Sequence, residues 1–213
     1  MSVDRPLKAA TAGLPLGSGV VDAGADHPSD TGTTPSMAIV VFSGLFPSTA
    51  QPNAGVFVRE RMFRVGEHLP LCVVAPTPWF PFQSLLRLVR PHFRPSPPAH
   101  QVQQGFDVWY PRYLSFPGVF KRFDGFFMAV ATYPLLRRLQ RQGRLDLIDA
   151  HFGYPDGYAA TRLGRWLDVP VTITLRGTEY RHSTSRALAR RLVQALQHCS
   201  HIFSVSAALK DVA

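Results

Sequence analysis

The sequence contains little cysteine and no long apolar run. Cys72 and Cys199 are the only two cysteines among its 213 residues, and they stand far apart with no Cys-x-x-Cys pairing. They can form neither a disulfide framework nor a zinc knuckle, and they favour a reducing compartment. No run of about 18 apolar residues occurs, so the sequence predicts no transmembrane helix. The first 36 residues also lack the apolar stretch of a secretory signal.

Common catalytic and cofactor-binding patterns are missing as well. The sequence has no Gly-x-x-x-x-Gly-Lys-Ser/Thr loop for nucleoside triphosphates and no Gly-x-Ser-x-Gly nucleophile elbow. The glycines around Gly55 lack the Gly-x-Gly-x-x-Gly spacing of nicotinamide- and flavin-binding domains, so no cofactor is expected. No second histidine stands at metal-ligand spacing from His151, which argues against a zinc site. The RNP pattern of RNA-binding sheets is absent too, which disfavours nucleic acid as a partner.

Acidic residues are scarce and unevenly placed. The chain has 23 Lys and Arg residues against 14 Asp and Glu residues, a formal net charge of +9. From Tyr110 to Arg144 there are seven Lys or Arg residues and one acid, Asp124. This asymmetry favours an anionic partner such as a membrane surface or a phosphorylated substrate. A solvated basic face would give the same pattern.

Residues 1–36 have a composition typical of disorder. They are rich in Gly, Ala, Ser, Thr, Pro and Asp and show no periodicity, so we expect a disordered N-terminal tail. Met37 stands directly before the first apolar run, which suggests that Met37 is the natural start of the protein. At the other end, residues 206–213 begin a helix without completing it, and we expect the chain to be truncated there.

Apolar runs alternate with amphipathic segments from Met37 onward. The predicted strands are 38–43, 71–75, 106–113, 145–150, 171–175 and 201–205. The predicted helices are 55–68, 84–92, 119–142, 156–167 and 183–198. The segment 76–82 contains three prolines, which remove hydrogen-bond donors and fix φ, so it is predicted to be irregular. Strands that alternate with helices predict an α/β fold, a Rossmann-like, open doubly wound and mostly parallel sheet over residues 37–205.

Candidate binding residues follow the predicted strands, because ligands of such sheets bind at the carboxyl ends of the strands. After the first strand, Asn53 precedes Gly55, whose missing side chain would let a phosphate approach the N–H groups that begin a helix. A turn with Asn53 as the helix cap is the alternative. After 145–150, His151 stands where an imidazole can contact a ligand and titrate near neutrality. A structural histidine is the alternative there.

A cation, a glycine and a carboxylate follow the strand 171–175. They are Arg176, Gly177 and Glu179. An arginine can hold a phosphate or a sugar hydroxyl, and a glutamate can accept hydrogen bonds from hydroxyls. An Arg–Glu salt bridge around a turn would explain the same residues.

Five segments, in this order, are similar to one known family. They are Phe46-Pro47-Ser48 with Gly55–Arg59, Val74–Trp79, Asp146–His151 with Pro155–Gly157, Pro170–Glu179, and Ile202–Ser206. Together they resemble the N-terminal domain of family 4 retaining glycosyltransferases, which have the GT-B fold of two Rossmann-like halves. The chain departs from the family at Arg176, where many members have histidine, and at Glu179, which replaces the usual aspartate.

The resemblance implies transfer of a sugar from a nucleotide sugar to a glycan or lipid-linked acceptor, with retained anomeric configuration and no bound metal. It implies that His151 contacts the donor sugar as a catalytic residue and that Gly55 borders the donor phosphates. The residues expected on the acceptor side of the cleft are Asn53, Tyr154, Arg176, Gly177 and Glu179.

The resemblance also implies that part of the enzyme is missing. In the family a C-terminal domain holds the donor, so residues 206–213 would begin the crossover to a missing domain, and this fragment alone would be inactive. A non-catalytic Rossmann-like module that binds an anionic glycan, lipid or phosphate is the alternative hypothesis.

A lipid-linked acceptor would suit the basic segment 84–94. Its Arg87, Arg90 and Arg94 stand among apolar residues and would lie on anionic headgroups. A helix packed on the sheet, with its arginines in water, is the alternative. We therefore expect a cytoplasmic protein of polysaccharide biosynthesis for the cell envelope, with peripheral contact at the inner face of the membrane.

Overall fold

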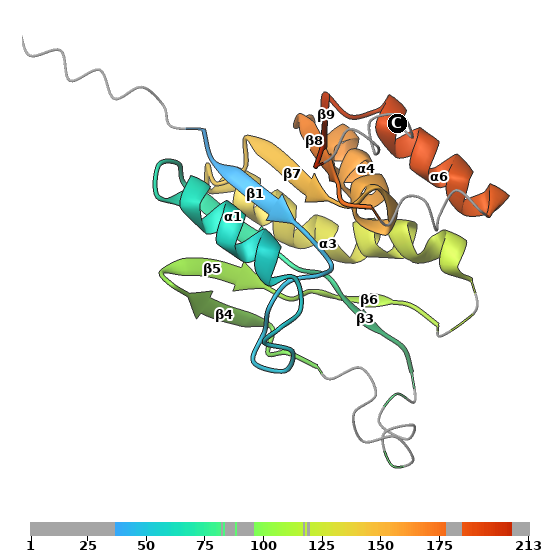
Figure 1. Cartoon of the computed structure of the whole chain (residues 1–213), viewed down its shortest axis with the longest axis horizontal. Helices are drawn as coiled ribbons and strands as arrows, with labels where there is room; N and C mark the ends of the chain where they lie inside the picture. Colours follow the sequence, from blue (N-terminus) through green and yellow to red (C-terminus); the bar gives the residue numbers. More distant parts are fainter. Residues whose placement is uncertain are drawn as a thin grey trace, which may run out of the picture. The chain divides into compact units, whose positions relative to one another are not determined.

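The sheet of this protein has the strand order β4-β5-β2-β1-β7-β8-β9. The computed structural model describes residues 37–81, 83, 88, 96–116, 118, 120–177 and 185–205, which all belong to the unit Pro35–Ala213. The strands of the sheet are β1 (Ile39–Phe42), β2 (Leu71–Val74), β4 (His100–Gln103), β5 (Phe106–Trp109), β7 (Leu147–His151), β8 (Val171–Leu175) and β9 (His201–Ser204). Neighbouring strands are parallel, except that β4 runs antiparallel to β5 (Figure 1).

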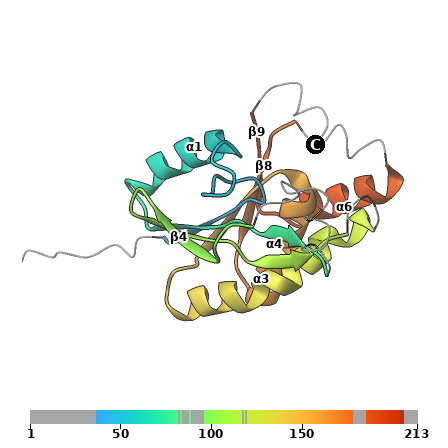
Figure 2. The same cartoon turned by 90° about the horizontal axis from the view of Figure 1, so that it is seen from below.

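Helices cover both faces of the sheet. They are α1 (Val56–Gly66), α3 (Asp124–Arg141), α4 (Tyr158–Leu167) and α6 (Arg186–Gln197). Figure 2 shows α1 on one side of the sheet and α3 and α4 on the other. The central strand β1 explains the two layers, because successive side chains of a strand point to opposite faces. Ile39 and Val41 pack in the core under α1, whereas Val40 and Phe42 pack in the core with α3, α4 and α6.

The predicted fold class is confirmed by this arrangement. The continuous apolar runs became the parallel strands β1, β2, β7 and β8, as expected of strands that are buried on both faces. The order of the strands on the two sides of β1 makes the sheet open and doubly wound. Within the described residues, no helix is both long and apolar enough to cross a membrane.

The prediction of an irregular segment at 76–82 was wrong for its centre. Thr77–Trp79 forms β3, which pairs in parallel with β6 (Arg112–Leu114) in a separate two-stranded sheet. The N–H of Thr77 donates to the carbonyl of Pro111 at 2.8 Å, and the N–H of Ser115 donates to the carbonyl of Trp79 at 2.8 Å. Pro78, which lies between these two bonds, is tolerated because the hydrogen bonds are formed by the backbone groups of Thr77 and Trp79, and no N–H is needed at residue 78.

Three other boundaries differ from the prediction. The predicted strand 106–113 is two strands, β5 and β6, because Pro111 interrupts it. The helix predicted from residue 119 is a 3-10 turn, η1 (Lys121–Phe123), followed by α3, with Pro134 inside α3. The helix predicted from residue 156 begins at Tyr158, after the irregular turn η2 (Gly153–Gly157). The predicted helix 84–92 lies almost wholly outside the described residues, as do residues 1–36 and 206–213.

Candidate functional site

A pocket of about 520 Å³ lies at the carboxyl ends of β1, β2 and β7. It is lined by Gly44, Leu45, Pro76, Pro78, Tyr113, Lys121, Asp124, Met128, Phe152, Tyr154, Pro155, Asp156 and Leu188. We call it the strand-end pocket. A hollow of about 690 Å³ lies at the opposite, amino ends of β1 and β2. We place the functional site in the strand-end pocket, because open parallel sheets bind their ligands beyond the carboxyl ends of the strands.

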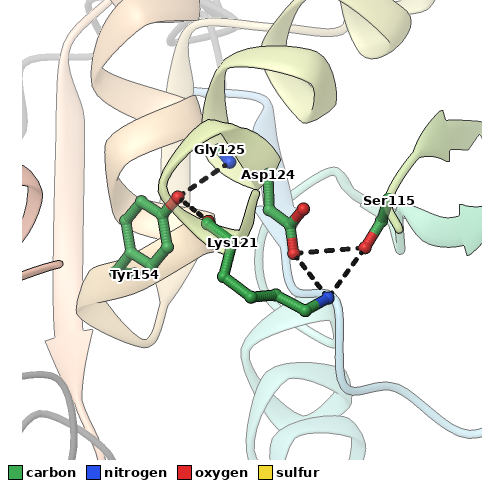
Figure 3. Close-up of polar contacts among 5 residues, drawn as sticks. All are labelled: Ser115, Lys121, Asp124, Gly125 and Tyr154. Atoms are coloured by element: carbon green, nitrogen blue, oxygen red, sulfur yellow. Dashed lines mark hydrogen bonds and ion pairs between the residues drawn. The ribbon is translucent and has the colours of Figure 1, made fainter. Parts of the chain in front are cut away.

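One wall of the strand-end pocket carries an ion pair at the start of α3 (Figure 3). The ammonium of Lys121 donates to Asp124 Oδ2 at 3.1 Å and to Ser115 Oγ at 3.1 Å, and Ser115 Oγ donates to the same carboxylate oxygen at 3.1 Å. Asp124 is buried, so its carboxylate needs these partners. The Lys121 side chain is 41% exposed and has a third N–H with which to meet a ligand.

Tyr154 joins this wall to the turn η2. Its hydroxyl donates to the carbonyl of Lys121 at 2.5 Å and accepts from the N–H of Gly125 at 3.4 Å (Figure 3). Burial raises the pKa of Tyr154 to about 12, so the phenol stays neutral. Tyr154 was expected on the acceptor side of a cleft, and the structure places it in the lining of the strand-end pocket. Its observed contacts position the start of α3.

A buried carboxyl group, Asp156, forms part of the pocket lining between β1 and η2. One carboxyl oxygen, Oδ1, accepts a hydrogen bond from the N–H of Gly44. Burial raises the pKa of Asp156 to about 7, so both protonation states are populated near neutrality. The site therefore holds one group that can donate or accept a proton at working pH, and one fixed cation, Lys121.

His151 and Arg176, predicted at two neighbouring strand exits, lie in contact. Arg176 Nε and Nη2 both approach His151 Nδ1, at 3.2 Å and 2.9 Å. Since a guanidinium only donates, Nδ1 accepts, and the ring proton of the neutral imidazole is on Nε2. Arg176 also lies over the ring of Phe57, with its Cζ 5.0 Å from the centroid. Burial lowers the pKa of Arg176, and the nearby charge of Arg61 lowers it further.

The prediction that His151 titrates near neutrality was wrong. Its side chain has no exposed surface, and burial, reinforced by Arg176 and Arg61, lowers the pKa of His151 to about 3. Asp149 Oδ2 lies 3.5 Å from His151 Nε2, within ion-pair distance, but Nε2 forms no hydrogen bond among the described residues. Burial raises the pKa of Asp149 as well. Contact of His151 with a donor sugar stays a prediction, because the described side chain has no exposed surface and its Nδ1 is bonded to Arg176.

Gly55 begins α1, but the predicted cap does not form. The N-cap residue is Gly55 itself, in a left-handed conformation with φ +67°, and no side chain caps the helix. Asn53 is exposed two residues earlier, so its prediction as the cap was wrong. A Cβ at Gly55 would stand 2.2 Å from the carbonyl oxygen of Leu45, which accounts for glycine here without any ligand. Proximity of Gly55 to donor phosphates stays a prediction.

The remaining predicted residues are only partly within the described chain. Gly177 follows β8 with φ +95°, and a Cβ there would meet nothing within 4 Å. Glu179 lies outside the described residues, as do Arg87, Arg90 and Arg94. Within the described ranges, no three His, Cys, Asp or Glu side chains are grouped closely enough to hold a metal ion. Metal independence therefore stays a prediction.

Lys121, Asp124 and Asp156 were not predicted as site residues. The Lys–Asp spacing of three residues at the beginning of a helix is a usable signal, because residues three apart are neighbours on a helix. The position of the Lys121–Asp124 pair in the pocket depends on the packing of α3 beside β6, which no local sequence pattern predicts.

These features define a Rossmann-like half domain with a ligand pocket at the strand ends. Residues 86–213 match the family described as Glycosyltransferase Family 4. The chain belongs to this family, which confirms the resemblance found in the sequence. It is also similar to a protein of Bacillus subtilis (strain 168) named as a candidate teichuronic acid biosynthesis glycosyltransferase, TuaC, with 27% identity over 183 residues. The match covers 83% of this chain and 46% of TuaC, so the chain spans about half the length of this relative.

Proposed function

We propose that this chain forms the acceptor-side half of a retaining glycosyltransferase, which transfers a sugar from a nucleotide sugar to a glycan or lipid-linked acceptor. The observation that carries the proposal is the strand-end pocket, because it combines the position expected for a ligand with membership of the family. The name of TuaC refers to teichuronic acid biosynthesis. From this similarity we infer that the present protein also acts in polysaccharide biosynthesis.

The walls of the strand-end pocket suit a sugar ring. Pro76, Pro78 and Tyr113 offer apolar surface to the ring's C–H face, and Lys121 offers an N–H to a hydroxyl or an anionic substituent. Asp156 would accept from, or donate to, a second hydroxyl. In this proposal the reaction depends on positioning the acceptor hydroxyl against the donor and on stabilising the leaving diphosphate.

Steady-state kinetics of the protein expressed from the complete reading frame test the proposal. Lys121→Met removes the cation from the pocket, and Leu188→Trp narrows the pocket without removing a partner of Asp124. We expect Lys121→Met to raise the acceptor KM about tenfold, the worth of one hydrogen bond to a charged group. Leu188→Trp should raise the acceptor KM because the larger side chain leaves less room for the acceptor, and both variants should leave the donor KM unchanged.

Arg138→Ala is the matched control, because Arg138 is exposed on α3 and does not line the pocket. Melting curves separate loss of fold from loss of binding. An unchanged acceptor KM in both variants would contradict the acceptor role. Absence of any transfer by the intact wild-type protein, with glycan binding retained, would favour the non-catalytic module instead.

A further inference from the structure

A second, small hollow lies between α4 and α6. It has a volume of about 100 Å³ and is lined by Tyr158, Thr161, Arg162, Arg165, Gln194 and His198. It shares no lining residue with the strand-end pocket, so the proposed function does not account for it.

The hollow concentrates positive charge. Arg162 and Arg165 come from α4, and Arg191, on the neighbouring α6, lies beside Gln194 of the lining. Neither helix contains an Asp or a Glu. Among the described residues, no carboxylate forms an ion pair with any of these three arginines. Like charges held together without a counter-charge favour the binding of an anion.

The ring of Tyr158 holds two of the guanidinium groups in place. Arg162 Cζ lies 4.9 Å from the ring centroid, and Arg191 Cζ lies 5.1 Å from it. Arg191 Nη1 also donates to the Tyr158 hydroxyl at 2.9 Å and to Gln194 Oε1 at 3.0 Å. Because Tyr158 is buried and these contacts are fixed by α4 and α6, the cations are positioned before any ligand arrives.

One buried donor of this cluster supports an anionic ligand. Arg162 Nε is buried and has no hydrogen-bond partner among the described residues, although buried donors ordinarily have an acceptor.

We propose that this hollow binds a phosphate group through Arg162 and Arg165. Its volume of about 100 Å³ would hold roughly three waters at about 30 Å³ each, enough for the free oxygens of one phosphate monoester. Arginine suits this ligand because its planar fork of donors matches the geometry of phosphate oxygens. The group belongs either to a soluble phosphate compound or to a lipid headgroup, since both present the same oxygens.

Calorimetric titration of the 213-residue chain with inorganic phosphate, at constant ionic strength, tests the site. We expect saturable binding to the wild type. Arg165→Gln should weaken it about tenfold, because a charge-assisted hydrogen bond is lost. Arg165 is exposed and forms no hydrogen bond, ion pair or cation–π contact with the described residues, so the fold should be unaffected.

Arg162→Gln is the second variant and should weaken phosphate binding at least as much, with its melting curve as the check on folding. Arg141→Gln is the matched control, because it removes the same charge from an exposed position on α3. No saturable phosphate binding by the wild type, or an equal loss in Arg141→Gln, would overturn the proposal.

Vesicles separate the two sources of the phosphate group. We compare co-sedimentation with phosphatidylcholine vesicles that contain phosphatidic acid and with vesicles of phosphatidylcholine alone. Binding only to the former, weakened by Arg165→Gln, assigns the site to a lipid headgroup. Binding of inorganic phosphate without binding to either vesicle assigns it to a soluble phosphate compound. Neither readout depends on sugar transfer, so failure of the proposed function would not affect the result.

Discussion

Asp156 and His151 are buried titratable side chains whose pKa values are displaced in opposite directions. Burial raises the pKa of Asp156 from 3.8 to about 7 and lowers that of His151 from 6.5 to about 3. Between pH 3.8 and about 7, the folded protein therefore holds a proton on Asp156 that the unfolded chain has lost. Between about pH 3 and 6.5, the unfolded chain holds a proton on His151 that the folded protein lacks. The stability that Asp156 contributes is present below pH 3.8 and is lost as pH rises through 7. The contribution of His151 is present above pH 6.5 and is lost as pH falls through 3.

The two substitutions should consequently have opposite pH dependence. Relative to wild type, Asp156→Asn should gain stability as pH rises from 4 to 6.5, by about 1 kcal/mol per pH unit. His151→Asn, which keeps an acceptor near Arg176, should lose stability relative to wild type over the same range. Urea unfolding of the three proteins at several pH values measures both trends. If plots of unfolding free energy against pH were parallel for all three proteins, folding would not displace the pKa of either group.

The sequence could predict where a side chain lies when its residue directly follows a strand, although neither His151 nor Arg176 lines the strand-end pocket. His151 and Arg176 end β7 and follow β8, and the parallel pairing of these strands brings the two side chains into contact. The protonation state of His151 could not be predicted, because it depends on complete burial. Lys121 and Asp124 were missed because the structure of their surroundings depends on long-range packing of α3 and β6.

Among the elements, α1 depends on an unusual first residue. Gly55 has φ +67°, and a Cβ would stand 2.2 Å from the backbone oxygen of Leu45. Gly143 has nearly the same φ, +66°, but its Cβ would meet nothing within 4 Å. These two glycines therefore separate the cost of a left-handed conformation from the cost of a backbone clash.

Gly143→Ala should destabilise the protein by about 1 kcal/mol, the cost of a left-handed conformation for a residue with a Cβ. Gly55→Ala should cost at least about 2 kcal/mol more, because α1 must also move away from Leu45. Thermal and urea unfolding measure both. Equal destabilisation would show that the entry into α1 adapts without strain.

Strands with both faces covered were predictable from their apolar runs, and the exposed strand β9 was also predicted, as 201–205. The apolar runs of β1, β2, β7 and β8 identify them, because both faces of each strand are covered. The strand β4 was missed, since His100–Gln103 is largely polar and exposed. It forms a hairpin with β5 through Gln104 and Gly105, which both have positive φ. Two-residue hairpin turns of this kind usually have the sequence Asn-Gly. Because this turn has glutamine at its first position, Gln104, the sequence did not predict it.

At the scale of the whole molecule, the described part of the chain offers few donors to a diphosphate at the strand ends. Lys121 is the one Lys or Arg among the residues that line the strand-end pocket. A diphosphate is usually held by several charge-assisted hydrogen bonds. We therefore expect the proposed donor contacts to come chiefly from outside this chain.

Calorimetric titration of the 213-residue chain with UDP-glucose or GDP-mannose should show no binding tighter than millimolar. Because the hollow between α4 and α6 would also attract phosphate, the titration is made with Arg165→Gln. If the reading frame extends beyond residue 213, the longer protein with the same substitution is the positive control. Micromolar affinity of the 213-residue chain would place the donor site within these residues.

The central position of β1 has a consequence for how the chain is made. Ile39 pairs with Leu147 of β7, and the N–H of Ala38 donates to a carboxyl oxygen of Asp146, 108 residues further along. At a synthesis rate of roughly 5–20 residues per second, β1 waits roughly 5 to 20 seconds for this neighbour. During that time one edge of an apolar strand is unpaired, so the nascent chain is most vulnerable to aggregation before β7 leaves the ribosome.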